Sequence, residues 1–257
     1  MIIFYEETEA KMRISFVIIL VLFISLQGHS IGRDSSEVHN GISFSYGYHL
    51  PFMDLSKRFL SFSEVGARYE IRTKNGFLWR FGGSFLFRDT IKQTNILDGL
   101  TNENGYILTG EGEIANVFLW QRGFLADVTL GKVFRLGNKG GSIAASLGGG
   151  FMQHKILLYS KEFYIPQVQE EYAKGYDRLT NGILLKESVH YRYFPNNRLL
   201  GFFAGVNGIQ GFTKNRRAFN FDTRSVEDEL RYDFSLSLEL GVTILFNRKT
   251  PDEYYFY

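Results

Sequence analysis

The most regular feature of the sequence is an alternation of apolar and polar residues over long stretches. In residues 231–246, RYDFSLSLELGVTILF, every second residue from Tyr232 to Ile244 is apolar, and polar residues or glycine stand between them. A period of two is typical of a β-strand with one apolar and one polar face. The segment is about three times as long as the usual strand of a soluble sheet.

The same alternation recurs in seven other segments, so we predict eight strands. It is strict in the first three segments and less perfect in the next four, where Glu187 is out of place among apolar positions. The glycines at 148–150 fall where a small closed sheet needs a bend or close packing. The predicted strands are residues 41–50, 64–72, 77–88, 124–136, 142–159, 184–194, 199–214 and 231–246.

The breaks between these segments alternate in length. Three are short, at 74–76, 137–141 and 195–197, and four are long, at 51–60, 89–122, 161–181 and 216–229. This alternation is typical of an antiparallel up-and-down meander, with turns on one side, loops on the other and both termini on the turn side.

Residues 89–122 are interpreted as one loop, although YILTG and EIANVFLWQ inside it resemble strands. A ninth barrel strand there would place the long 161–181 loop among the short turns. We therefore predict an extracellular hairpin or a short helix above the barrel in this segment.

The N-terminal segment is predicted to be a secretory signal peptide, residues 1–30. Residues 14–26, ISFVIILVLFISL, are uncharged and apolar, Lys11 and Arg13 precede them, and small residues Gly28 and Ser30 follow. The run is too short for a transmembrane helix, which needs about 20 residues. Met12 is an alternative start, because the acidic stretch before it does not suit a signal peptide. Residues 31–40 would then form a periplasmic N-terminal segment.

An export signal together with long, aromatic-rich strands favours an all-β fold, an eight-stranded antiparallel transmembrane β-barrel over residues 41–247. At about 3.3 Å per residue and a tilt near 40°, such strands cross an apolar band of about 25 Å. The apolar faces would meet lipid and the polar faces would fill the lumen. The alternative is a soluble lipocalin-like barrel with an apolar lumen.

Eight strands enclose only enough space for side chains, so the lumen charges are expected to pair as a plug. This structural network is preferred to a proton path or a catalytic site, and an open channel is not expected. The residues predicted to form it are Glu64, Arg68, Glu70, Arg72, Arg80, Asp127, Lys186, His190, Arg192, Asp233 and Glu239.

With its signal peptide, its eight alternating segments and its alternating loops and turns, the chain resembles the small outer-membrane β-barrels of Gram-negative bacteria, the OmpA/OmpX type. The resemblance covers about residues 41–246 and includes no diagnostic motif. It implies contact with outer-membrane lipid, both lipopolysaccharide and phospholipid. It ends before 247–257, NRKTPDEYYFY, because such barrels usually finish in an aromatic residue that closes the last strand. Pro251 cannot donate to a strand ladder, so residues 248–257 are predicted to be a periplasmic tail.

Composition excludes several kinds of chemistry. The absence of cysteine excludes a disulfide framework, a cysteine zinc site, a thiol nucleophile and a lipid anchor on cysteine. A net charge of +2 gives no electrostatic footprint for nucleic acid. No spacing suggests a metal site or a cofactor.

A hydrolytic site is an alternative, because some small outer-membrane barrels like those that the chain resembles modify lipid A. His154 with Ser160 and Glu162 is the nearest approach to a nucleophile, base and acid, but its spacing fits no motif. We therefore predict no catalytic residues.

Aromatic residues in two loops and in the tail favour a partner-binding role. Four consecutive aromatics in water would form an exposed apolar patch unless the membrane interface, a partner protein or the barrel-insertion machinery covers them. The sequence thus favours a non-enzymatic scaffold or accessory subunit of an outer-membrane complex, in protein assembly or secretion. The alternatives are a lipid A-modifying enzyme, an adhesin or a small porin-like barrel. The predicted partner-binding residues are Tyr254, Tyr255, Phe256, Tyr257, Phe163, Tyr164, Tyr172, Tyr176 and Trp120.

Overall fold

The computed structural model describes residues 39–246, apart from 138–139, 161–164, 166–167, 169 and 196–198. The predicted signal peptide and the aromatic tail at 248–257 therefore lie outside the described residues. No helix in the described part of the chain has the length and apolar character that a membrane span requires.

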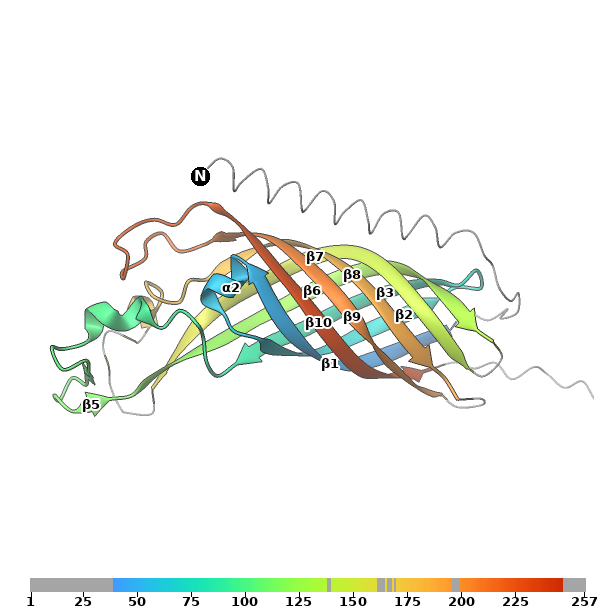
Figure 1. Ribbon diagram of the computed structural model, residues 1–257, viewed down its shortest axis with the longest axis horizontal. Helices are drawn as coiled ribbons and strands as arrows, with labels where there is room; N and C mark the ends of the chain where they lie inside the picture. Colours follow the sequence, from blue (N-terminus) through green and yellow to red (C-terminus); the bar gives the residue numbers. More distant parts are fainter. Residues whose placement is uncertain are drawn as a thin grey trace, which may run out of the picture. The chain divides into compact units, whose positions relative to one another are not determined.

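Eight strands form a closed antiparallel barrel in the order β1-β10-β9-β8-β7-β6-β3-β2 (Figure 1). Strands that are consecutive in the barrel pair with each other, and β1 pairs with β10 from Gly41 opposite Leu245 to Met53 opposite Asp233. The predicted eight-stranded up-and-down barrel is confirmed. Its strands are β1 (His39–Met53), β2 (Phe62–Arg72), β3 (Phe77–Arg88), β6 (Val117–Leu136), β7 (Gly141–Ser160), β8 (Thr180–Tyr193), β9 (Leu200–Asn215) and β10 (Leu230–Leu245).

The long loops carry the remaining elements. Helix α2 (Leu55–Arg58) lies between β1 and β2, and α3 (Glu170–Ala173) lies between β7 and β8. The β3–β6 connection contains the 3₁₀ helix η2 (Asn95–Leu100) and a hairpin of β4 (Ile107–Leu108) and β5 (Ile114–Ala115). This connection therefore contains both a short helix and a hairpin.

Two predicted loop boundaries were wrong. Strand β6 begins at Val117 rather than at residue 124, because residues 117–120 pair with β7 beyond the point where β3 ends. Strand β7 likewise continues past its last partner in β8, His154 opposite Thr180. The two 20-residue strands thus extend above the barrel as a two-stranded ribbon. Strand β1 also runs through Pro51 to Met53, where it pairs with β10 alone.

The glycines of β7 allow close packing against β6. A Cβ atom added to Gly148 or Gly150 would overlap the backbone oxygen of Val128 or Ala126. These positions point into the lumen, where β6 and β7 come too close together for a larger residue.

Candidate functional site

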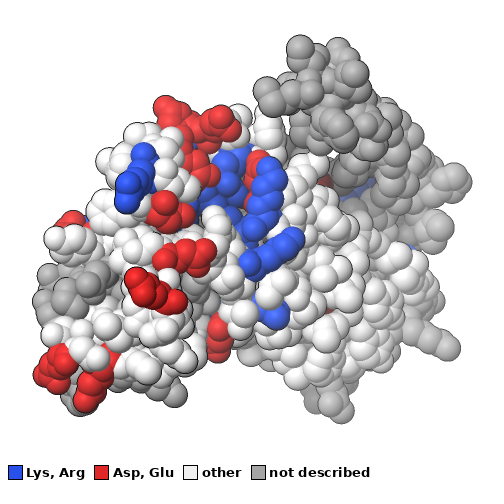
Figure 2. Space-filling view, turned by 60° about the vertical axis from the view of Figure 1, so that its left-hand side comes forward, with Lys and Arg blue, Asp and Glu red and all other residues white. Residues whose placement is uncertain are grey.

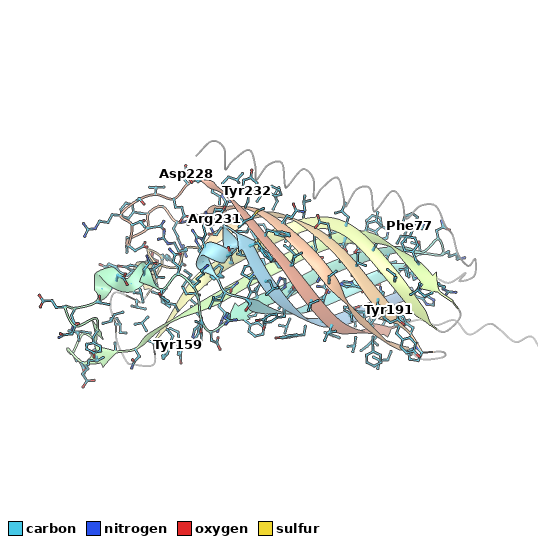
Figure 3. All side chains as sticks on the ribbon, in the orientation of Figure 1. Phe77, Tyr159, Tyr191, Asp228, Arg231 and Tyr232 are labelled. Carbon is cyan, nitrogen blue, oxygen red and sulfur yellow. The ribbon has the colours of Figure 1, made fainter. Side chains whose placement is uncertain are left out.

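The outer wall of the barrel is apolar. Large side chains on every strand are exposed there, up to 67 % for Leu238. Phe77 and Tyr191 lie at the turn end, whereas Tyr159 and Tyr232 lie at the loop end (Figure 3). Bands of aromatic residues at both ends of an apolar wall are typical of a barrel that crosses a membrane, because their rings favour the two interfaces.

The half of the lumen nearest the loops contains a layer of apolar side chains, which corrects the expectation that polar side chains would fill the lumen. Leu55 of α2 and Phe59, which follows α2, enter this half from above. Both are buried, and they meet a layer of buried side chains from six strands. These are Phe62, Leu86, Leu125, Met152, Leu184 and Ile209. The β1–β2 loop thus caps the lumen with an apolar plug.

The half nearer the turns contains paired charges. Arg68 makes ion pairs with Glu239 and, at 3.3 Å, with Glu64. Lys186 Nζ lies 2.9 Å from Asp127 Oδ1. All five side chains are buried. Because each charge has lost its water, the opposite charges beside it are needed to stabilise it.

Two further groups extend this network toward the turns. Arg192 makes an ion pair with Glu70. Arg80 donates to Ser188 at 2.7 Å and lies 3.1 Å from His190 Nδ1. The lumen layer therefore balances four cations, Arg68, Arg80, Lys186 and Arg192, against four carboxylates, Glu64, Glu70, Asp127 and Glu239.

Sequence reasoning missed two members of the network. His49 Nε2 lies 2.6 Å from Glu64, and Asn207 Nδ2 donates to Glu239 at 2.9 Å. Both occupy inward positions of their strands, so the alternation contained a signal for them. Two predicted members lie apart from the network. Arg72 is half-buried near the turn end of β2, and the described contacts join it to none of these residues, whereas Asp233 pairs with His154 nearer the loops.

His154 does not form the considered hydrolytic trio. Its Nε2 lies 2.8 Å from Asp233 Oδ2, which also accepts a 2.6 Å hydrogen bond from Thr213. Ser160 is six positions along the same strand, about 20 Å away at the usual rise. Glu162 lies outside the described residues. Phe59 covers the His154 ring edge-on, so this group is sealed beneath the plug.

A cluster of arginines joins three loops above the plug. Glu227 in the β9–β10 loop accepts ion pairs from Arg58, Arg231 and Arg178, at 2.5, 3.1 and 3.3 Å. Burial alone would raise the pKa of Glu227, but the three guanidinium charges outweigh it and hold that pKa below its ordinary value. The carboxylate thus links the β1–β2, β7–β8 and β9–β10 loops.

The β3–β6 connection and the ribbon ends of β6 and β7 form a lobe, defined here as residues 89–120 and 155–160. Its small core joins Ala115 to Ile165 and Val168 of the β7–β8 loop. Its surface exposes five large apolar side chains, Tyr106, Leu108, Ile114, Phe118 and Tyr159. Its segment 93–120 has four carboxylates, all exposed, and no lysine or arginine, and the two cations of the lobe are Lys92 and Lys155. Figure 2 shows acidic and basic side chains gathered over the loops on the face in view.

The predicted partner-binding aromatics differ in their placement. Tyr172 is 62 % exposed, whereas Tyr176 is buried against the edge of Phe221 and has no free surface for a partner. Trp120 stacks on Tyr159 at the base of the lobe, with ring centroids 4.3 Å apart. Phe163, Tyr164 and the tail residues Tyr254, Tyr255, Phe256 and Tyr257 lie outside the described residues.

The arrangement offers no site for a metal. No group of three or more His, Asp or Glu side chains in the described ranges could hold one.

The chain is similar to several solved structures. Ail of Yersinia pestis is 15% identical, with a TM-score of 0.43 over 82% of this chain and 99% of Ail. Neisserial surface protein A is 10% identical, with a TM-score of 0.42 over 80% of this chain and 97% of that protein. A major outer membrane protein from Thermus thermophilus is 11% identical, with a TM-score of 0.40 over 80% and 99%. No protein-family model matches the sequence, and no curated protein matches it either.

The chain has the fold of an outer-membrane β-barrel. Its closed strands and apolar wall require a bilayer around it, because an apolar wall of this extent cannot face water. We expect the long loops to be extracellular and the short turns to be periplasmic, as in other barrels of this kind.

Proposed function

We propose that this barrel is a non-enzymatic scaffold or accessory subunit of an outer-membrane protein complex, in protein assembly or secretion. The observation that carries the proposal is the lobe, which extends beyond the barrel on the β6–β7 ribbon and exposes apolar side chains among carboxylates. Exposed apolar residues of this kind are typical of a surface that a partner covers. The carboxylates beside these residues favour a partner with basic as well as apolar side chains.

The filled lumen supports a role outside transport. The apolar plug and the balanced charges occupy the space between the strands, so we expect no conductance by the purified protein in planar bilayers. The sealed His154–Asp233 group supports a role outside lipid A chemistry, since the plug keeps a substrate from reaching it.

Co-purification tests the proposal. The protein, tagged in the β9–β10 loop, is extracted from outer membranes in mild detergent together with two variants. One carries Leu108→Asn and Ile114→Asn on the exposed hairpin of the lobe. The other carries Val226→Asn, at an aliphatic residue in a different loop that is more exposed than either hairpin residue.

A stoichiometric complex should survive Val226→Asn and be lost with the hairpin variant. A lone barrel in all three samples would refute the scaffold role, and comparison of lipid A with and without the protein would then test the enzyme alternative. Removal of residues 251–257 tests the tail separately: loss of the complex only on truncation would make the tail, and not the lobe, the docking element.

A further inference from the structure

The outer wall of β8 and β9 has a polar pair within its apolar surface. Gln210 Nε2 donates a hydrogen bond of 2.8 Å to Glu187 Oε1. Both side chains point away from the lumen, because their neighbours Lys186 and Ile209 point inward and are buried. Glu187 is the residue that breaks the apolar pattern of its strand, so the structure places this break on the lipid-facing wall.

The pair lies between the two aromatic bands. Tyr191 and Phe202 flank it toward the turns, and Phe212 flanks it toward the loops. A carboxyl group on the lipid-facing wall of a barrel is unfavourable between these bands. Ionisable residues at such depth mark functional positions, because they are unfavourable unless another group binds them. Among the described residues, Gln210 is the one side chain that donates to Glu187.

A glycine allows the carboxyl group to lie flat on the wall. Gly208 stands directly opposite Glu187 on β9. A Cβ atom at Gly208 would lie 2.8 Å from Glu187 Oε2. Any larger residue would therefore push the carboxyl group away from the sheet. The Glu187 side chain is partly exposed on this wall, so a second molecule can approach it.

We propose that Glu187 and Gln210 form the centre of a contact between two copies of this chain within the outer membrane. Gln210 keeps a second N–H and its carbonyl oxygen, and Glu187 keeps its second oxygen. A two-fold axis between the two residues lets each Gln210 donate its second N–H to Glu187 of the other copy. A second copy thus supplies the complementary groups by symmetry, whereas a different protein would need its own matching pair.

The surrounding wall fits this contact. Val189, Val206, Leu236 and Leu238 lie near the pair and are 45% to 67% exposed. They are aliphatic, so they can pack closely against the same residues of the second copy. The contact is independent of the lobe and of the partner proposed for it.

Single-cysteine cross-linking tests the proposal, because the chain has no cysteine of its own. Leu185→Cys places a thiol beside the pair, opposite Gln210. Val65→Cys is the matched control, since Val65 is an exposed aliphatic residue on β2, across the barrel from β8. Each protein is refolded into vesicles of phosphatidylethanolamine and phosphatidylglycerol and oxidised. The heat-dependent gel shift shows that each variant has folded.

Leu185→Cys should give a disulfide-linked dimer that Val65→Cys does not give. Adding Glu187→Leu or Gln210→Leu should weaken self-association about tenfold, as expected for the loss of two hydrogen bonds within the membrane. Adding Glu187→Gln should preserve the dimer, because the amide keeps an acceptor and supplies donors.

Three results would overturn the proposal. The first is equal cross-linking of the two cysteine variants, and the second is an undiminished dimer with Glu187→Leu. The third is a cross-link from Leu185→Cys in intact cells to another protein in place of a second copy, which would assign the wall to a different partner.

Discussion

Replacing Arg68 with methionine should show whether water reaches the charged side chains in the lumen. Arg68 is buried, pairs with Glu239 and Glu64, and donates to Ser45 Oγ at 3.2 Å. Methionine fills a similar space without the charge. It leaves Glu64 with His49 at 2.6 Å, and Glu239 with Asn207 at 2.9 Å and His190 at 3.1 Å.

The expected loss in the free energy of unfolding is about 3–5 kcal/mol, the usual result of removing one partner from a buried ion pair. This lowers the folding equilibrium constant by roughly two to four orders of magnitude. Adding Glu239→Gln should restore about 1–3 kcal/mol, because it removes a carboxylate that Arg68→Met leaves without its cation.

Urea titration in phospholipid vesicles, followed by the fluorescence of Trp79 and Trp120, measures both changes. The control is Lys57→Met, which removes the exposed pair with Asp54, where the Lys57 side chain is 74% exposed. Such exposed pairs contribute about 0–1 kcal/mol. If Arg68→Met costs no more than this control, water reaches Glu64 and Glu239, and the lumen is not sealed.

Three further changes test other parts of the barrel. Phe59→Ala should lower the free energy of unfolding, measured by urea titration, by about 3–5 kcal/mol through the cavity left in the plug. The control Phe219→Ala, at a side chain 43% exposed, should change it little. Equal effects of the two substitutions would mean that the plug is not packed. Gly150→Ala should abolish the heat-dependent gel shift of the folded barrel, because its Cβ would overlap the backbone of Ala126. Gly83→Ala should keep this gel shift, because its Cβ meets nothing nearer than 4.0 Å. A folded Gly150→Ala barrel would refute the close approach of β6 and β7. The lowered pKa of Glu227 means that its contribution to loop stability is complete well above its ordinary pKa of 4.5 and disappears as the pH falls through the lowered value. Proteolysis of residues 216–229 should therefore accelerate in acid for the wild type, and its rate should depend less on pH for Glu227→Gln. The same pH dependence of the proteolysis rate in both proteins would contradict the role of Glu227.

Much of the fold could be predicted from the sequence because alternation reports directly on which face of a strand meets lipid. It failed where both faces are apolar. In the run Phe85-Leu86-Phe87 the middle residue points into the lumen, so the alternation disappears and the apolar plug could not be seen. The start of β6 was missed for a different reason. EIANVFLWQ resembles a strand, but it was assigned to the loop because a ninth barrel strand would have broken the alternation of loop lengths, whereas most of it is the start of β6 itself.

The candidate site was harder to predict than the fold. Alternation selects the residues that face the lumen, but it does not specify their partners, which depend on the stagger of the closed barrel. Arg68 and Glu239 are 171 positions apart in the sequence, and their pairing requires all eight strands to be in register. Of the lipid-facing pair, the sequence indicated Glu187, because it breaks the alternation of its strand. It did not indicate Gln210, which lies on the next strand.

The pairing of β1 with β10 has a consequence for how the protein reaches its native state. This seam joins the first strand of the barrel to the last, so it forms only after the whole intervening chain has been delivered. Until then the chain has two unpaired strand edges, each a template for wrong association. Long-range pairing of this kind also makes folding slow. A chaperone that binds the incomplete sheet until β10 can pair with β1 would therefore determine how much of the protein is inserted correctly.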